Sequence, residues 1–158
     1  MREPRPAEAP DASPPPVPRM IIAVLALAGV LLSAYMLLYK IGVISTLACG
    51  EGGCEAVQNS PFAVFLGIPV PLLGVIGYGT ILAIAVMGVQ PRFVADRRIA
   101  AGLMLTTSLA AGFTIYLSYL EAFVIQSWCR WCIGSAVLVA ALFLLSLTEI
   151  PRIRRAAV

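Results

Sequence analysis

The sequence predicts an all-α membrane protein, a bundle of four transmembrane helices with a short half-helix at the rim of its first outer loop. Two observations lead to this fold class. First, the 158 residues are 60% hydrophobic and only 12% charged, whereas a soluble domain of this size carries about a quarter charged residues. Second, the apolar residues gather into four runs, each near the roughly 20 residues that a helix needs to cross a bilayer.

The four predicted spans follow one another with little chain between them, over residues 20–39, 62–89, 99–120 and 131–148. They are too long and too evenly apolar for the strands of a membrane barrel. Pro69 and Pro71 interrupt the second run near its start, because proline breaks the hydrogen-bond ladder of a helix. We therefore expect residues 62–69 to form the rim half-helix, with the true crossing beginning near Pro71.

One membrane domain is expected over residues 20–150, between two tails. Residues 1–19 contain seven prolines and no apolar run, which predicts a disordered tail; residues 151–158 form a basic tail. The first span is not expected to be a cleaved signal peptide, since Lys40 follows it instead of a small-residue cleavage site. Lipidation of Cys49 is not expected either, because nine residues separate it from Tyr39 at the end of the span.

The distribution of basic residues predicts the orientation of the chain. With four crossings, the segments before the first span, between the second and third, and after the fourth share one face. That face carries nine basic residues and the other face carries two, a strong positive-inside bias. Both termini should lie in the cytoplasm. The net charge of +3 is explained by this bias, and no nucleic-acid partner is expected.

Four cysteines all fall on the predicted outer side, where disulfides persist. Cys49 and Cys54 lie in a glycine-rich loop, and Cys129 and Cys132 form a C-x-x-C at the start of the last span. Structural disulfides are one interpretation, although a bond within either pair would close a short loop and stabilise little. A metal site built from two cysteine pairs is a second interpretation, although the chain has no histidine. Redox chemistry is the third.

The redox interpretation has a physical basis. Two cysteines three positions apart share one helical face, and the partial positive charge of a helix N-terminus favours the thiolate. Arg130 adds positive charge, and Cys132 lies one turn deeper, where a membrane-dissolved acceptor can reach it. The glycine-rich loop around Cys49 and Cys54 is expected to be mobile and exposed, so its cysteines can meet a soluble partner.

Residues 49–79 ("CGEGGCEAVQNSPFAVFLGIPVPLLGVIGYG") and 115–132 ("IYLSYLEAFVIQSWCRWC") resemble the vitamin K epoxide reductase family in its bacterial form. The resemblance extends from about Ile22 to Leu147, and it implies that the protein lies in the cytoplasmic (inner) membrane of a bacterium. It implies that Cys49 and Cys54 are a shuttle pair and that Cys129 and Cys132 are the active-site pair. It also implies that a quinone head group binds in a pocket near Ser60. We expect this pocket to be lined by Tyr116, Leu117, Ile125 and Trp128.

The implied activity is thiol oxidation. A reduced extracytoplasmic thioredoxin-like (DsbA-type) protein would pass electrons to Cys49, and from there through Cys54, Cys129 and Cys132 to a quinone, menaquinone or ubiquinone. The chain ends at Val158 without the thioredoxin-like domain fused to some bacterial members, which implies a separate partner. Ala136 stands where the mammalian branch has a tyrosine, and this favours a quinone over vitamin K epoxide. Glu121 is expected to be a solvated interface carboxylate, with proton relay to the quinone as the alternative.

Overall fold

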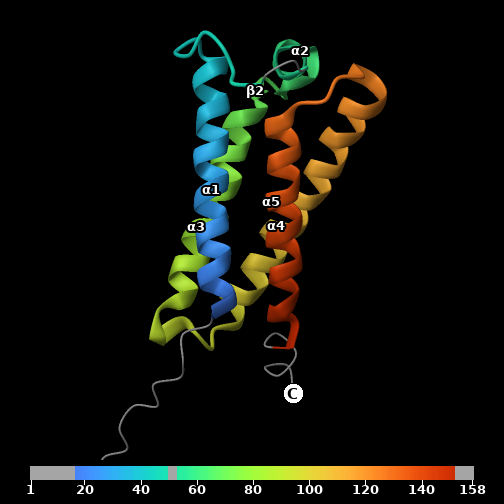
Figure 1. Cartoon of the computed structure of the whole chain (residues 1–158). Coiled ribbons are helices and arrows are strands. Elements are labelled where there is room, and N and C mark those ends of the chain that lie inside the picture. Colours follow the sequence, from blue (N-terminus) through green and yellow to red (C-terminus); the bar gives the residue numbers. More distant parts are fainter. Residues whose placement is uncertain (1–16, 50–52, 152–158) are drawn as a thin grey trace, which may run out of the picture.

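The computed structural model describes residues 17–49 and 53–151, and it contains the four predicted helices. Each is long and apolar enough to cross a membrane. They alternate in direction along the bundle (Figure 1), which confirms the predicted fold class. Their bounds are α1 (Val17–Lys40), α3 (Val70–Val89), α4 (Arg97–Tyr119) and α5 (Arg130–Ser146).

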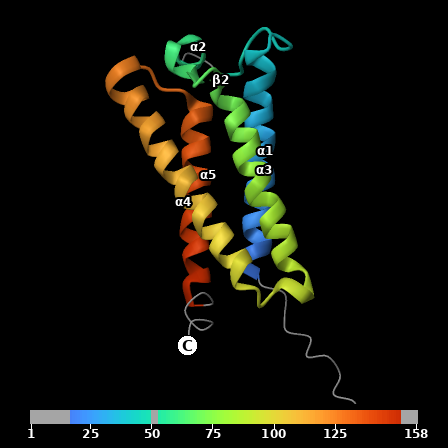
Figure 2. The same ribbon diagram turned by 180° about the vertical axis from the view of Figure 1, so that it is seen from behind.

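The number of helices decides which segments meet at each end of the bundle. Because it is even, the start of α1 and the end of α5 lie at the same end, which we call the terminal end (Figures 1 and 2). The short elements between α1 and α3 lie at the opposite end together with the start of α5. We call this the cysteine end, because it holds all four cysteines. The predicted tails at residues 1–16 and 152–158 lie outside the described residues.

The segment between α1 and α3 differs from the prediction in detail. A short rim helix is present, but it is α2, which runs over Cys54–Asn59. The half-helix expected over residues 62–69 is absent, because Leu66 and Gly67 have positive φ angles of 51° and 84° and reverse the chain in a two-residue hairpin turn. The crossing begins at Val70, as the prolines predicted. The hairpin and the turn before it are η1 (Pro61–Ala63), β1 (Val64–Phe65) and β2 (Ile68–Pro69).

At the terminal end, α1 begins at Val17, three residues before the predicted span. Arg19, expected in the tail, is instead a fully buried residue of this helix. Its Nη2 lies 2.6 Å from Oε2 of Glu149, which is also buried. Its Nη1 donates to the carbonyl of Gly88 over 2.8 Å and to that of Val94 over 3.2 Å. This buried charge is therefore matched by acceptors from three other segments of the chain.

The helices are joined inside the bundle by close packing and by polar bonds. α1 packs most extensively against α3, where a Cβ atom at Gly29 would lie 2.3 Å from the ring of Tyr78. The Tyr78 hydroxyl lies 2.8 Å from Oγ of Ser135 on α5. Between α4 and α5, the hydroxyls of Thr107 and Ser146 are 2.9 Å apart and fully buried. Small residues and hydroxyl pairs of this kind are typical of helix contacts in membranes.

Candidate active site

The four cysteines form two pairs in different states. Cys49 and Cys54 are joined by a disulfide, with their Cα atoms 6.3 Å apart, while Cys129 and Cys132 are free thiols. Cys49, Cys54 and Cys129 belong to one buried apolar cluster, and Cys132 packs against it. Because Cys49 and Cys54 bond to each other, the four sulfurs do not form a single four-cysteine metal site in this structure.

The last turns of α1 hold the disulfide in place. The hydroxyl of Tyr35 accepts a hydrogen bond from the backbone N–H of Ala48 over 3.0 Å, next to Cys49. The Nζ of Lys40 donates to the carbonyl of Gln58 in α2.

The prediction of exposed loop cysteines is wrong, since Cys49 is 4% exposed and Cys54 is fully buried. Residues 50–52 of the loop lie outside the described residues.

A close contact between two loops brings the cysteine pairs together. A Cβ atom at Gly53 would lie 2.6 Å from Cβ of Ser127 and 3.3 Å from its Cα. Only glycine therefore fits at this contact without moving one of the loops. Gly53 directly precedes Cys54, and Ser127 lies two residues before Cys129. Both cysteines are fully buried in the same cluster, so the contact lies within two residues of each pair.

Cys129 occupies the N-cap position of α5, and its sulfur accepts a hydrogen bond from the backbone N–H of Cys132 over 3.4 Å. The pKa of Cys129 lies below its ordinary value, mainly because the Cys132 thiol forms a hydrogen bond with its sulfur. Burial and the nearby Glu121 carboxylate oppose this shift. The sequence predicted a stabilised thiolate from the helix terminus and Arg130. The neighbouring thiol makes the largest contribution instead.

Glu121 lies beside this pair, in a π-helical segment that continues α4, η3 (Leu120–Ile125). Its Oε2 accepts a hydrogen bond from the backbone N–H of Cys129 over 3.3 Å. The side chain is only 6% exposed, so the expectation of a solvated carboxylate is wrong. The wider π-helical turn, a geometry common at functional sites, rotates Glu121 toward the bundle while Phe123 and Val124 remain exposed.

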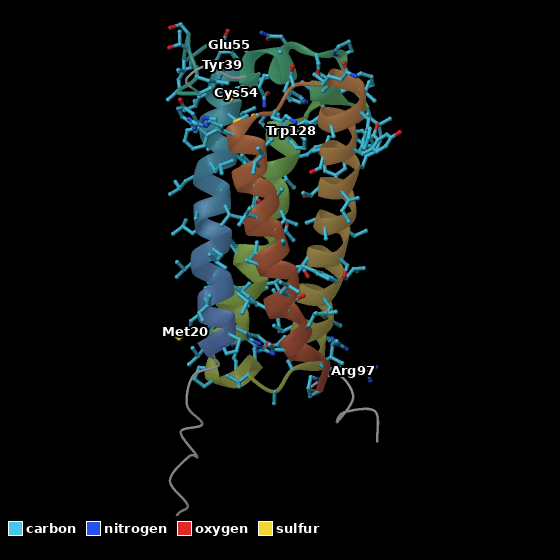
Figure 3. The ribbon with its side chains drawn as sticks, turned by 45° about the vertical axis from the view of Figure 1, so that its right-hand side comes forward. Met20, Tyr39, Cys54, Glu55, Arg97 and Trp128 are labelled. Carbon is cyan, nitrogen blue, oxygen red and sulfur yellow. A yellow bond between two sulfur atoms is a disulfide. The ribbon has the colours of Figure 1, made fainter. Side chains whose placement is uncertain are left out.

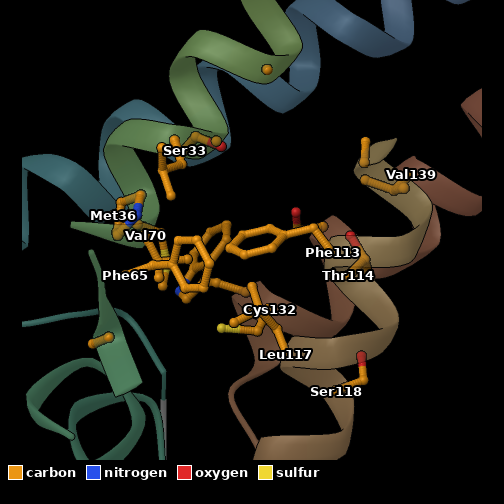
Figure 4. A pocket seen from close by; sticks show the side chains of 18 of the residues that line it. Ser33, Met36, Phe65, Val70, Phe113, Thr114, Leu117, Ser118, Cys132 and Val139 are labelled. Atoms are coloured by element: carbon orange, nitrogen blue, oxygen red, sulfur yellow. The ribbon is translucent and has the colours of Figure 1, made fainter. Parts of the chain in front are cut away.

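A cavity of about 550 Å³ opens beside Cys132, lined mostly by apolar residues of the four long helices and of the segment from α2 to β2 (Figure 4). Of the residues predicted to bind the acceptor, Ser60, Leu117 and Ile125 line this cavity. Tyr116 and Trp128 lie outside it and are 45% and 57% exposed. Trp128 projects at the cysteine end (Figure 3). The binding roles of all five residues stay predictions.

Two polar atoms in the cavity wall have no hydrogen-bond partner among the residues that the structure describes. They are Oε1 of Gln58 and Nε1 of Trp131, and both are buried. Gln58 was not selected from the sequence, and Trp131, which flanks Cys129 as Trp128 does, was considered for a quinone contact but is not among the five residues predicted above. A signal existed for both: Gln58 follows Cys54 by four positions, which places both on one face of a helix, and Trp131 stands inside the C-x-x-C. Buried polar groups without partners are rare in native proteins, and a ligand in the cavity would satisfy these two.

The fold and the site together define a class: a four-helix membrane protein with a buried dithiol, an adjacent disulfide and an apolar cavity that reaches the dithiol. Residues 20–147 match the family model described as the vitamin K epoxide reductase family, and the chain belongs to this family. The resemblance noted from the two cysteine segments is thereby confirmed.

A relative in Arabidopsis thaliana, the thiol-disulfide oxidoreductase LTO1, is 31% identical over 123 residues. The match covers 75% of this chain and 33% of that protein. The chain thus spans about a third of the length of this relative.

Proposed function

We propose that this protein is a membrane thiol-disulfide oxidoreductase, which takes electrons from a reduced thioredoxin-like protein and passes them to a membrane quinone. One observation carries the proposal: Cys132 borders the apolar cavity, while its neighbour Cys129 shares a buried cluster with the Cys49–Cys54 disulfide. One pair can thus exchange with the other on one side and face a lipid-soluble acceptor on the other side. The name of the Arabidopsis relative, a thiol-disulfide oxidoreductase, supports the reaction class.

The first part of the reaction reduces the loop pair. A thiolate of the partner protein attacks Cys49, the more exposed residue of the disulfide, and Cys54 leaves as a thiolate. The second thiol of the partner then attacks the mixed disulfide and releases Cys49. The partner has lost two electrons and gained a disulfide, and Cys49 and Cys54 are thiols.

The second part moves these two electrons inward. The Cys54 thiolate attacks Cys129 of the oxidised C-x-x-C, forms a Cys54–Cys129 disulfide and displaces Cys132. Cys49 then attacks Cys54, restores the Cys49–Cys54 disulfide and displaces Cys129. The arrangement in the structure, a disulfide in the loop and two thiols on α5, corresponds to the state after this step. The lowered pKa of Cys129 makes its sulfur a good leaving group when Cys49 displaces it.

The residues of the cavity fit a quinone. When bound, a quinone accepts two electrons and two protons. The apolar wall suits its ring and tail, and the buried N–H of Trp131 can donate a hydrogen bond to a carbonyl oxygen. Gln58 offers a donor and an acceptor from its side-chain amide. Ser60 also lines the cavity, but its hydroxyl donates to the carbonyl of Val57 over 2.7 Å, so it must release this bond to donate to a ligand.

The orientation in the membrane is part of the proposal, with the cysteine end outside the cytoplasm and both termini inside. Cys49 is bonded to Cys54 and therefore has no free thiol to label, but Val43 is 67% exposed at the cysteine end, and Ala95 is exposed at the terminal end. A membrane-impermeant maleimide should label Val43→Cys in whole cells and Ala95→Cys only after the membrane is opened. The reverse pattern would show that the cysteines face the cytoplasm.

The decisive experiment starts with purified protein whose four cysteines have been reduced. Addition of a quinone should re-oxidise the thiols and produce quinol, which is followed by its absorbance. Cys132→Ser should abolish the quinone-dependent re-oxidation of the thiols, because Cys132 is the cysteine that borders the cavity. If quinone leaves the thiols of the wild-type protein reduced, the protein is not a quinone-dependent oxidase. A structural disulfide or cysteine-bound metal would then be the better explanation, and metal analysis would separate these two.

A further inference from the structure

We propose that Glu121 is a catalytic residue, which carries the proton of the Cys132 thiol to and from the cysteine pair of α5. This inference rests on the proposed function, since it assigns a residue to the same redox site. The sequence suggested proton relay to the quinone only as an alternative role of Glu121, and its place beside the cysteine pair comes from the structure.

The position of Glu121 meets the geometric requirements of a proton carrier. Its carboxylate accepts the backbone N–H of Cys129 over 3.3 Å, its side chain and that of Cys132 line the same cavity, and the thiol of Cys132 lies within hydrogen-bonding range of the carboxylate. A general acid or base must lie within hydrogen-bond reach of the proton that it transfers, and Glu121 satisfies this condition for Cys132. The backbone bond from Cys129 fixes the carboxylate next to the sulfur pair.

No other carboxyl group of the described residues lines the cavity. Glu55 lies on α2 at the same end of the bundle but is exposed, and Arg130, between the two cysteines, is exposed as well. On α1, the Lys40 ammonium is directed to the carbonyl of Gln58. Cys132 is itself partly buried beside Glu121, so bulk water is a poor alternative as proton acceptor. Apart from the sulfur of Cys129, the proton of its thiol therefore has one nearby acid–base group among the described residues, which is Glu121.

The transfer balances in both directions. When Cys54 attacks the Cys129–Cys132 disulfide, the Cys54–Cys129 bond forms and the Cys129–Cys132 bond breaks. The electron pair of the broken bond stays on Cys132, and the Glu121 carboxylic acid gives it a proton, which leaves a thiol and a carboxylate. When the α5 dithiol is oxidised, the Cys129–Cys132 bond forms again. The two electrons go to the quinone, and the Cys132 proton returns to the Glu121 carboxylate, which holds it for the next cycle. Because Cys129 is a thiolate, the two protons of the quinol come from water.

The substitution Glu121→Gln tests this role without removing the local hydrogen bond. The amide oxygen of glutamine still accepts the N–H of Cys129, but an amide cannot take up the thiol proton. Glu121→Asp keeps the carboxyl group at a shorter reach and should restore part of the activity. Glu55→Gln is the matched control, the same change on an exposed glutamate at the same end of the bundle.

The first measurement needs no quinone. An infrared difference spectrum between oxidised and reduced protein should contain the C=O band of a protonated carboxyl group in the oxidised form, and the band should shift with isotope-labelled glutamate. Glu121→Gln should abolish this band, and Glu55→Gln should keep it. Absence of the band from the wild-type protein would overturn the proposal even if the Glu121→Gln variant failed to fold.

The second measurement is the rate at which a small dithiol reduces the α5 disulfide, as a function of pH. Loss of a positioned acid or base costs about a hundredfold or more, so Glu121→Gln should be slowed by about that factor and should lose a pH dependence that Glu121→Asp retains. Equal rates and equal pH profiles for Glu121→Gln and the wild type would also overturn the proposal. Because both measurements omit quinone, they remain decisive if the quinone experiment above fails, and the two failures are distinguishable.

Discussion

The backbone N–H of Cys132 donates to the sulfur of Cys129 across the first turn of α5, over 3.4 Å. The Cys129 sulfur thus replaces the side-chain oxygen that usually caps a helix N-terminus. The same sulfur is the one that the disulfide of the loop must exchange with. The cap therefore stabilises the thiolate form of the residue that has to act as leaving group and nucleophile.

The first prediction concerns the pH dependence of Cys129. Because its pKa is lowered, the thiolate should persist as the pH falls below the ordinary pKa of a thiol, and its reactivity should be lost only at lower pH. Cys132→Ala removes the thiol that makes the largest contribution, so the profile should move to higher pH. The rate of reaction of Cys129 with a small disulfide, measured across pH, checks this. A profile that stays in place would assign the shift to the backbone instead.

The second prediction concerns the contact of Gly53 with Ser127. Gly53→Ala should push the two loops apart, because the new methyl group would lie 2.6 Å from Cβ of Ser127. A displacement of about 1 Å at reacting groups can cost on the order of a hundredfold in rate. We therefore expect electron transfer from the loop pair to the α5 pair to slow by roughly tenfold to a hundredfold, as measured by rapid quenching and thiol trapping.

The matched control for this contact is Gly79→Ala on α3. No atom lies within 4 Å of the position that its Cβ would take, so the added methyl group should leave the transfer rate unchanged. Equal rates for Gly53→Ala and Gly79→Ala would mean that the loop contact does not control the approach of the two cysteine pairs.

The third prediction compares the two tryptophans that flank Cys129. Trp131→Phe keeps an aromatic ring next to Tyr35, whose ring centroid is 5.0 Å away, but removes the buried N–H donor. Loss of one hydrogen bond should raise the KM for quinone roughly twofold to tenfold. Trp128→Phe, outside the cavity, should leave KM unchanged. The opposite result would support the sequence-based assignment of Trp128 and remove Trp131 from the acceptor site.

The fourth prediction concerns Ser60. The residue precedes Pro61 at the N-cap position of η1, but its side chain makes no cap hydrogen bond there. Ser60→Ala should therefore fold normally, and any kinetic effect reports on the hydroxyl in the cavity. We expect quinone reduction to slow by about tenfold, the lower end of the range for a lost donor where charge develops. Unchanged kinetics would leave the hydroxyl with its bond to Val57 and no role in the reaction.

The fifth prediction concerns the buried ion pair at the terminal end. Arg19→Met removes the guanidinium from the buried carboxylate of Glu149 and should lower the free energy of unfolding by about 3–5 kcal/mol. The double substitution Arg19→Met with Glu149→Met should recover part of this loss, because no charge then remains to be compensated. Thermal unfolding in detergent measures both. A double variant as unstable as the single one would show that the bonds of Arg19 to backbone carbonyls, such as Gly88, matter more.

Local patterns in the sequence were sufficient for the fold class and for part of the candidate site. Helix length and apolar composition determine crossings through lipid, so the four spans, and the start of α3 next to its prolines, could be predicted from runs of residues. The spacing of Cys129 and Cys132 predicts a redox pair at the start of α5, and the four cysteines, Ser60 and the four helices in their order resemble the family to which the chain belongs. The signals for the helices and for the C-x-x-C each lie within one segment, and the chemistry of the bilayer leaves few alternatives.

The remaining features of the site and of the terminal end depend on contacts between segments. Such contacts depend on how the helices pack together, and the sequence of a single helix does not reveal them. Glu121 is an ordinary acid in a sequence of mostly apolar residues until the π-helical turn after α4 directs it to Cys129. Gln58 and Trp131 become cavity residues only when α2 folds over the start of α5. Arg19 changes from a tail residue to a buried one because Glu149, 130 positions away, arrives at the same end of the bundle. An even number of crossings brings such distant residues together, and only the packed structure reveals which of them meet.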